Sequence, residues 1–125
     1  MSVWGDGVYG CEIEAVLAIV GGKWKLPILW HLRKGVLRYA ELRRRLPGIS
    51  ERVLINQLRE LEADGMVHRT QYPEVPPRVE YALTEKGCSL TPVLTILAEW
   101  GREHAAASPA AAAVADGEPP AAGAA

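Results

Sequence analysis

The chain reads SERVLINQLRELEADG over residues 50–65, and this stretch predicts a single helix with well-marked ends. Ser50 can accept a hydrogen bond from the first turn, and Gly65 suits the left-handed conformation that often follows a last turn. Three leucines recur at helical spacing between these ends, which predicts one buried stripe along the helix. They are Leu54, Leu58 and Leu61.

The opposite face of this predicted helix carries groups that can read nucleic acid. Arg52, Asn56 and Arg59 offer guanidinium and amide groups, which pair with base edges and phosphates, and Ile55 offers an apolar contact. Three acidic residues lie toward the far end, so a polyanion would meet the N-terminal half. A mixed charged face is also typical of a solvated surface helix, so the neighbouring elements have to be considered.

The residues before this helix predict a helix-turn-helix arrangement. Apolar spacing predicts helices over residues 11–20, 23–34 and 39–46, with a short strand or extended link at 36–37. A proline and a glycine at 47–48 force a tight turn. A helix, a short turn and a capped helix with a basic outer face form the pattern of helix-turn-helix proteins.

The residues after Gly65 predict a hairpin of the kind called a wing. Residues 66–72 and 78–83 have the alternation of strands, whereas the proline-rich residues 73–77 between them cannot be paired strand. Arg69 and Arg78 lie near this tip, as does Tyr72, and could reach a minor groove or its phosphates. The expected fold is therefore mainly α (α+β), a winged helix-turn-helix.

The ends of the chain extend beyond this core. Thr84 is a candidate N-cap for a last helix that runs to about His104, and Pro92 either kinks this helix or begins a new one capped by Thr91. We expect residues 1–10 to be a flexible arm and residues 11–104 to form the DNA-binding domain with its additional helices. The Ala/Pro/Gly-rich residues 105–125 are expected to be a disordered tail, although the alanines could extend the helix by a turn or two.

Charge is distributed unevenly along the chain. Residues 23–86 hold 13 Lys and Arg against 8 Asp and Glu, a local charge of +5, whereas the flanks hold one basic residue against seven acids, a charge of −6. The whole-chain value of −1 conceals this pattern. A basic centre within an acidic frame indicates that the middle of the chain faces a polyanion.

Several other classes of protein are disfavoured. No apolar run approaches a membrane span and no signal peptide is evident, so the cytoplasm is the expected compartment. The two cysteines lack metal-ligand spacing, and we expect no metal and no cofactor. No catalytic triad, carboxylate pair or phosphate loop is present, so we expect no enzyme activity.

The main functional signal is a set of basic side chains on the elements that converge on one side of a winged helix. Phosphate contacts of this kind supply much of the affinity for DNA. Arg52 and Asn56 are the best candidates for reading bases, while Arg59 could contact a base or a phosphate. The predicted DNA-binding residues are Arg43, Arg44, Ser50, Arg52, Ile55, Asn56, Arg59, Arg69 and Arg78; Arg45 belongs to the same basic run.

The first and last helices have apolar stripes that the winged-helix core does not require. The stripes either pack on that core or mediate self-association, and a two-fold dimer would place two recognition helices about one DNA turn apart. We expect a homodimer whose interface is formed by Ile13, Val16, Leu17, Val20, Val93, Leu94, Leu97 and Trp100.

Cys11 opens the first predicted helix. A helix N-terminus can favour the reactive thiolate, so Cys11 is a candidate redox sensor; a small buried structural residue is the other interpretation. Cys88, in the first turn of the last helix, is more consistent with a structural role.

The chain resembles the HxlR-type transcriptional regulators, which are winged-helix proteins related to the MarR group. The resemblance covers about residues 11–101. Its matching stretches are IVGGKW (19–24), LPGIS (46–50), LRELE (58–62) and EVPPRVEY (74–81), together with Cys11, Ile28, Leu29, Leu32, Tyr39, Glu41, Leu42, Leu54, Asp64, Gly65, Arg69, Leu83, Thr84, Gly87, Leu90, Pro92 and Trp100.

The resemblance implies a homodimer held by its terminal helices, which binds palindromic operator DNA as a repressor or activator. It also implies that Cys11 occupies the position at which some members sense oxidants or electrophiles. Two positions depart from the usual pattern: Glu12 stands where proline is common, and Ile55 stands where a small polar residue is usual. A carboxylate beside a thiol disfavours the thiolate, and Ile55 offers a base only apolar contact.

Residues and resemblance together predict a dimeric, sequence-specific regulator that binds double-stranded DNA. Within the same fold, an alternative is a regulator that responds to a small-molecule effector bound between the dimer helices and the core. From another class, the alternative is a winged helix that serves only as a protein-interaction module, for which apolar anchors would be expected in place of converging arginines.

Overall fold

The computed structural model describes residues 10–115. The chain folds into two compact units, residues 1–91 and 92–125. The flexible arm predicted for residues 1–10 lies outside the described residues except for Gly10, which begins the first helix. Among the described residues, no helix is long and apolar enough to cross a membrane.

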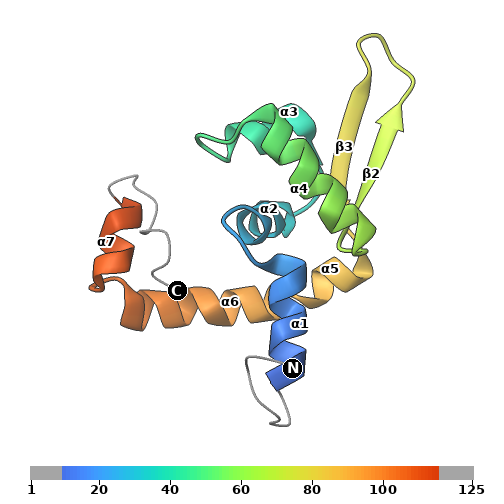
Figure 1. Cartoon of the computed structure of the whole chain (residues 1–125). Helices are drawn as coiled ribbons and strands as arrows, with labels where there is room; N and C mark the ends of the chain where they lie inside the picture. Colours follow the sequence, from blue (N-terminus) through green and yellow to red (C-terminus); the bar gives the residue numbers. More distant parts are fainter. Residues whose placement is uncertain (1–9, 116–125) are drawn as a thin grey trace. The chain divides into compact units, whose positions relative to one another are not determined.

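The first unit contains five helices and a three-stranded antiparallel sheet in its described part (Figure 1). Strand β3 lies in the middle of the sheet, with β1 on one side and β2 on the other. The elements in chain order are α1 (Gly10–Val20), α2 (Lys25–Leu32), β1 (Leu37–Arg38), α3 (Tyr39–Arg44), α4 (Glu51–Ala63), β2 (Val67–Tyr72), β3 (Arg78–Leu83) and α5 (Glu85–Ser89). The winged helix-turn-helix prediction is confirmed.

Helix α4 has the ends that its sequence predicts. The hydroxyl of Ser50 accepts a hydrogen bond from the backbone nitrogen of Val53 at 3.1 Å, which satisfies one of the unpaired amides of the first turn. Beyond the last turn, Gly65 has a φ of 75°, a conformation that glycine adopts without the steric cost of a Cβ. These two residues account for where α4 begins and ends.

The core of the first unit lies between α2, α3, α4 and the sheet. The three leucines of α4 are at most 2% exposed, and α2 buries three apolar residues against them and the sheet. Burial of such apolar side chains is the main stabilising term of a domain of this size. The fully buried members of this core are Ile28, Leu29, Leu32, Leu42, Leu54, Leu58, Leu61 and Val67.

A charged contact also joins α2 to α4. The ammonium group of Lys25 lies 2.7 Å from a carboxylate oxygen of Glu60, and the Lys25 side chain is 11% exposed. A lysine so little exposed requires a partner for its charge. This ion pair therefore holds the start of α2 against the C-terminal half of α4.

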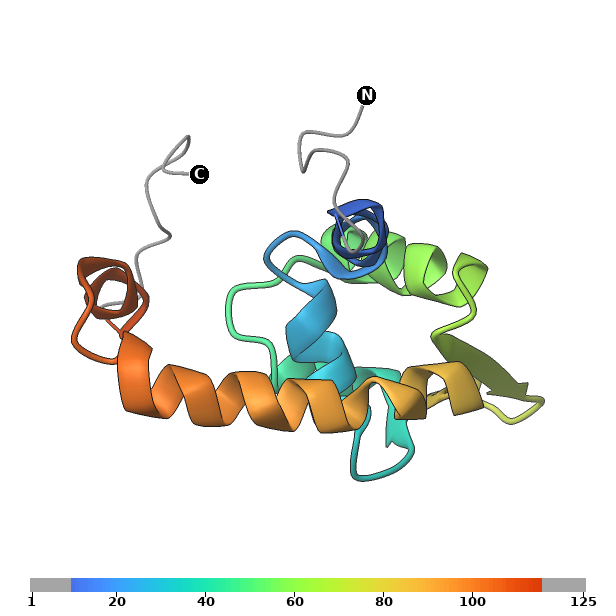
Figure 2. The same ribbon diagram turned by 90° about the horizontal axis from the view of Figure 1, so that it is seen from below.

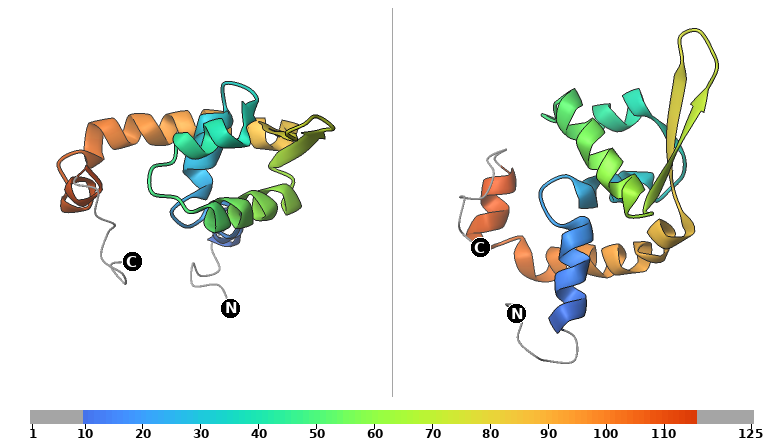
Figure 3. Two further views of the ribbon diagram at one scale, coloured as in Figure 1. Left: turned by 90° about the horizontal axis from the view of Figure 1, so that it is seen from above. Right: turned by 45° about the vertical axis from the view of Figure 1, so that its right-hand side comes forward.

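Strands β2 and β3 form the wing, which we define as residues 67–83 including its tip, residues 73–77. In register, Tyr72 pairs with Arg78 at the tip and Val67 pairs with Leu83 at the base. The hairpin extends away from the helices of its unit (Figures 1 and 3). Its length places the tip beyond the hydrophobic core, where it can meet another molecule.

The base of the wing is tied to the end of α4 through α5. Thr84 caps α5 by accepting a hydrogen bond from the Gly87 amide, and its hydroxyl donates to the carbonyl of Gly65. The ammonium group of Lys86 donates to the carbonyl of Asp64 at 2.8 Å. The N-cap prediction for Thr84 is confirmed, and these bonds link the end of α4 to the base of the wing.

Helix α1 stands at the edge of the first unit, as Figure 2 shows in a view nearly along its axis. Most of its side chains are exposed, and only Val20 is buried. Its apolar stripe is therefore largely uncovered in a single chain.

The second unit, residues 92–125, is helical in its described part. Helix α6 (Thr91–Trp100) starts just before Pro92, one residue after α5 has ended at its C-cap Leu90, so the chain begins a new helix here. A short π-helix, η1 (Gly101–Ala105), and helix α7 (Pro109–Ala115) follow. The prediction of a disordered tail from Ala105 differs from the structure over α7, since alanine has the highest helix propensity of all residues.

Candidate nucleic-acid interface

The exposed face of α4 carries the predicted base-reading residues. Arg52, Asn56 and Arg59 are exposed and follow one another at one-turn spacing, opposite the buried leucines. Ile55 is partly exposed on the same side. Ser50 is exposed at the N-terminus of the helix, where unpaired amides and the helix dipole favour a negatively charged group.

A groove of about 870 Å³ connects this face of α4 to the wing. One wall is formed by α4 and the other by the wing, and Arg38 of β1 and the start of α3 also line it. The lining residues are Arg38, Tyr39, Ala40, Glu51, Ile55, Arg59, Glu62, Arg69, Glu74, Val75, Pro76, Pro77, Arg78, Val79 and Tyr81. We call this cavity the α4–wing groove.

Four arginines line the α4–wing groove, against three glutamates. A small net charge means that affinity for a polyanion must come from individually placed guanidinium groups. Arg59 on α4 and Arg69 on β2 are both exposed, and Arg69 donates a 3.0 Å hydrogen bond to the neutral side chain of Gln71. Neither group forms an ion pair among the described residues, and guanidinium is well shaped for phosphate oxygens.

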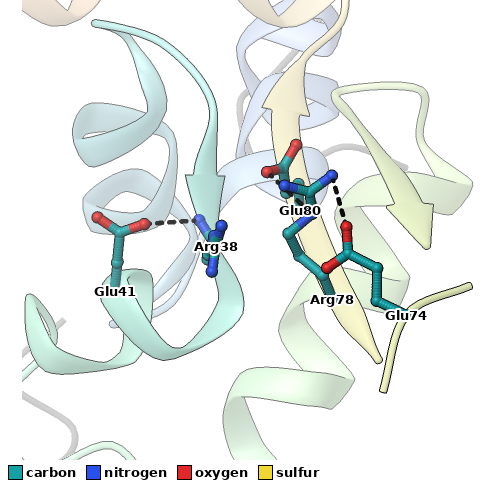
Figure 4. A network of polar contacts seen from close by, with 5 residues as sticks. All are labelled: Arg38, Glu41, Glu74, Arg78 and Glu80. Carbon is teal, nitrogen blue, oxygen red and sulfur yellow. Dashed lines mark hydrogen bonds and ion pairs between the residues drawn. The ribbon is translucent and has the colours of Figure 1, made fainter. Parts of the chain in front are cut away.

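Arg38 is a groove residue that the sequence analysis missed. It follows the buried Leu37 on the two-residue strand β1, and its backbone amide donates to the Glu41 carboxylate at 3.4 Å (Figure 4). A lone arginine on a strand too short for a periodic pattern carries little signal by itself. Its proximity to the wing depends on the pairing of Arg38 with Glu80 of β3.

Arg78 is engaged inside the wing. Its guanidinium lies between two carboxylates of the same hairpin, those of Glu74 and Glu80 (Figure 4). It also lies above the ring of Tyr72. The side chain is 27% exposed. Although it lines the groove, it differs from Arg69 in that its charge is already balanced.

Arg43 and Arg44 are exposed at the end of α3, but they do not line the α4–wing groove. Arg52 and Asn56 likewise lie outside it, on the part of α4 that faces solvent. The predicted set is therefore divided into a group within the groove and a group on the surfaces beside it.

Tyr39 contributes a polar atom to the wall of the α4–wing groove. Its hydroxyl is buried and makes no hydrogen bond within the part of the chain that the structure describes. Burial raises the pKa of the phenol, with a smaller contribution from the negative charge of Glu51, so Tyr39 is neutral at physiological pH.

Both cysteines are exposed and free. Cys11 is the second residue of α1, close to the helix N-terminus, and Glu12 follows it. Cys88 lies in α5. Across residues 10–115, no group of His, Cys, Asp and Glu side chains could hold a metal ion.

The terminal helices expose apolar side chains. On α1, Ile13, Val16 and Leu17 are 43%, 45% and 49% exposed. On α6, the exposed residues of the predicted interface are Val93, Leu97 and Trp100. Val20 and Leu94, which the sequence analysis assigned to the same interface, are only 4% and 7% exposed, so they offer little surface to a partner.

The HxlR-like helix-turn-helix family matches residues 19–109, which include α2, the helix-turn-helix pair and the wing. The chain belongs to this family. Its sequence is 51% identical to that of an HTH-type transcriptional regulator of Methanothermobacter thermautotrophicus over 100 residues, which are 80% of this chain and 76% of that relative.

Solved structures agree with this assignment. The redox regulator HypR in its oxidized form is 49% identical to this HxlR-like protein, with a TM-score of 0.71 over 75% of this chain and 97% of that one. A MarR-family transcriptional regulator from Porphyromonas gingivalis W83 is 41% identical, with a TM-score of 0.73 over 78% and 96% of the two chains. This HxlR-like protein is a helix-turn-helix transcriptional regulator with MarR-like architecture.

Proposed function

We propose that the protein binds specific double-stranded operator DNA as a homodimer, with α4 in the major groove and the wing against the adjacent backbone or minor groove. The observation that carries this proposal is the α4–wing groove, because its two walls present Arg59 and Arg69 toward a common space. In winged-helix proteins a phosphate strand can run between the recognition helix and the wing, and these guanidinium groups would contact it from both sides.

The residues of α4 and the residues near its N-terminus have separate roles in this proposal. Arg52 and Asn56 read base edges, and Ile55 contacts an apolar group such as a thymine methyl. Arg43, Arg44 and Ser50 contact phosphates and set the register of α4 on the duplex. Arg59 contacts a base or a phosphate.

The dimer is formed by the apolar residues that the terminal helices expose. Uncovered apolar stripes of this kind mark sites of association. Two-fold symmetry would repeat the recognition helix about one DNA turn away, which matches a palindromic operator. The exposed members of this interface are Ile13, Val16, Leu17, Val93, Leu97 and Trp100.

Cys11 is proposed as a thiol sensor. It is exposed near the N-terminus of α1, and α1 also carries part of the proposed dimer interface, so oxidation there could change how the protomers pair. The similarity to HypR, which has been solved in oxidized and reduced forms, supports a redox role. DNA release by diamide should be lost in Cys11→Ser. It should be retained in Cys88→Ser, the control, because Cys88 is also an exposed free thiol. A normal response of Cys11→Ser to diamide would rule out a sensing role for Cys11.

A titration of DNA binding tests the main proposal. Fragments of the protein's own promoter region are compared with a shuffled fragment of equal composition, in fluorescence anisotropy from about 50 to 200 mM salt. We expect preferred binding to one promoter fragment, with affinity that falls steeply as salt rises. Equal binding to promoter and shuffled DNA at every salt concentration would instead favour the alternative, a protein-interaction module without specific DNA binding.

A further inference from the structure

The tip of the wing has few backbone hydrogen bonds available to hold it. Three of its five residues, 73–77, are prolines, which have no amide to donate. The hydrogen bond that the structure shows at the tip runs from the Glu74 amide to the carbonyl of Tyr72 at 2.8 Å. Beyond it, Val75 is fully exposed. The position of the tip must therefore depend on side chains.

Arg78 makes three contacts near this tip, with Glu74, Glu80 and Tyr72, and Figure 4 shows those with the two glutamates. Its Nη2 lies 3.3 Å from a carboxylate oxygen of Glu74 in the tip, and its Nε lies 3.7 Å from a carboxylate oxygen of Glu80 on β3. The guanidinium carbon lies 3.9 Å from the centre of the Tyr72 ring, on the strand opposite. One planar group thus connects both strands and the tip.

We propose that Arg78 is a positioning residue that braces the tip of the wing, and that Arg69 is the arginine with which the wing contacts phosphate. The division of roles rests on the proposed DNA-binding function, whereas the brace itself is a property of the free protein.

Charge supports this division. Arg78 with its two carboxylate partners forms a cluster of net charge −1, so a phosphate that approaches it meets no excess positive charge. Its Nε is buried without a hydrogen bond among the described residues, since 3.7 Å to Glu80 is an ion-pair distance, so the group is held by charge and ring stacking. Arg69 is exposed and its partner Gln71 is neutral, which leaves its charge available.

The planar shape of guanidinium gives a second way to distinguish a brace from a phosphate contact. A phosphate contact needs mainly a positive charge, which lysine also supplies, whereas a planar group that stacks on a ring while it meets two carboxylates cannot be replaced by an ammonium group. Arg78→Lys should therefore lose the order of the tip and the DNA affinity to the same extent as Arg78→Met. If Arg78 bound phosphate, the lysine variant would keep most of the affinity.

The first measurement uses the full chain without DNA. Backbone ¹⁵N relaxation of Val75 reports the order of the tip on the picosecond to nanosecond timescale. We expect the heteronuclear NOE of Val75 to fall in Arg78→Met and in Arg78→Lys, and to stay at the wild-type value in Arg69→Met, which removes the same charge from the neighbouring strand. A wild-type NOE in both Arg78 variants would overturn the brace.

The second measurement is the dependence of DNA affinity on salt. Arg69→Met should reduce the slope of log K against log salt by about 0.9, the value for one lost phosphate contact. Both Arg78 variants should keep the wild-type slope and bind roughly three- to tenfold more weakly, because a loosened tip has to be ordered on binding. A slope reduced in Arg78→Met as much as in Arg69→Met would show that Arg78 contacts phosphate.

Tyr72→Leu provides a further variant that changes no charge. It removes the ring under the guanidinium, so we expect a lower Val75 NOE and weaker DNA binding with an unchanged salt slope. If Arg78→Met does not fold, this variant tests whether Arg78 braces the tip. An unchanged Val75 NOE would contradict the brace. Failure of the wild-type protein to prefer any promoter fragment would overturn the proposed function alone, since the Val75 relaxation is measured without DNA.

Discussion

Arg52 lies in the first turn of α4, exposed and outside the α4–wing groove, where a base edge could be reached without crossing the phosphate strand. We expect Arg52→Ala to lose discrimination at one base pair by about 1–3 kcal/mol, because an arginine that pairs with a guanine edge contributes about this much. Binding to a panel of operators with single base changes measures it. Arg44→Ala is the control, for which we expect a uniform loss on all sequences; a uniform loss for Arg52→Ala would make it a phosphate contact.

His31 near the C-terminus of α2 provides a prediction about pH. Burial lowers its pKa below 6.5, and the charges of Arg45 and Arg33 lower it further, while a hydrogen bond to the backbone of Arg45 opposes them. The unfolded chain therefore takes up a proton at a higher pH than the folded chain does. The stabilisation that follows from the neutral imidazole is present above pH 6.5 and is lost as pH falls through the folded pKa.

NMR titration of the His31 ring protons should give a midpoint below 6.5. Stability measured by urea unfolding should decline between pH 7 and pH 5, and His31→Gln should reduce that decline. A midpoint at or above 6.5 would contradict the burial and charge that the structure assigns to this ring.

At the scale of the element, α4 depends on its cap. Ser50→Ala should destabilise the protein by about 1 kcal/mol, because the hydrogen bond that the Val53 amide donates to the Ser50 hydroxyl is lost. Urea unfolding measures this change. Ser50→Asp keeps an acceptor at the same position, so its stability should stay near that of the wild type. If the aspartate destabilises as much as the alanine, the cap is not the cause.

Helix α5 depends on a glycine that no side chain can replace. A Cβ at Gly87 would overlap the carbonyl oxygen of Met66, which belongs to the backbone between α4 and β2. Gly87→Ala should therefore destabilise the protein by roughly 1–3 kcal/mol, the usual cost of overpacking. Gly101→Ala is the matched control, since a Cβ there meets no atom and helix propensity favours alanine. Equal thermal unfolding midpoints for the two variants would contradict this packing.

At the scale of the whole molecule, the proposed dimer depends on α1 and α6. Leu17 is 49% exposed and Leu97 is 52% exposed. A glutamate at either position would place a charge in the apolar interface, so both variants should sediment as monomers and lose most of their affinity for a palindromic operator. Val36→Glu is the control, because Val36 is similarly exposed but lies between α2 and β1. If the Leu17→Glu and Leu97→Glu variants both sediment as dimers, the dimer interface does not lie on α1 and α6.

Much of the secondary structure follows from local patterns. The leucine spacing of α4, its serine cap and its terminal glycine act within a few residues of each other, so they can be read along the chain. The same holds for the proline-rich tip of the wing and for the cap at Thr84. The boundary at Pro92 remained open between two local solutions, and the alanines of α7 form a helix where their low complexity suggested disorder.

The candidate site is predictable only in part. Arg59 and Arg69 are apparent from their basic character, but their meeting across one groove requires the packing of α4 against the sheet. Arg38 enters that groove only because β1 pairs with β3. The sequence suggests that Arg78 is equivalent to Arg69, whereas the fold surrounds it with two carboxylates and a ring.

Periodicity, caps and turn residues thus account for the elements of this winged helix, because backbone hydrogen bonding and side-chain alternation are local. The partners of each charged side chain are not local, because they depend on which elements the buried core brings together. For this reason the chain by itself indicates a basic DNA-facing surface, while the packed structure separates the arginines that can meet phosphate from the one that is already engaged within the wing.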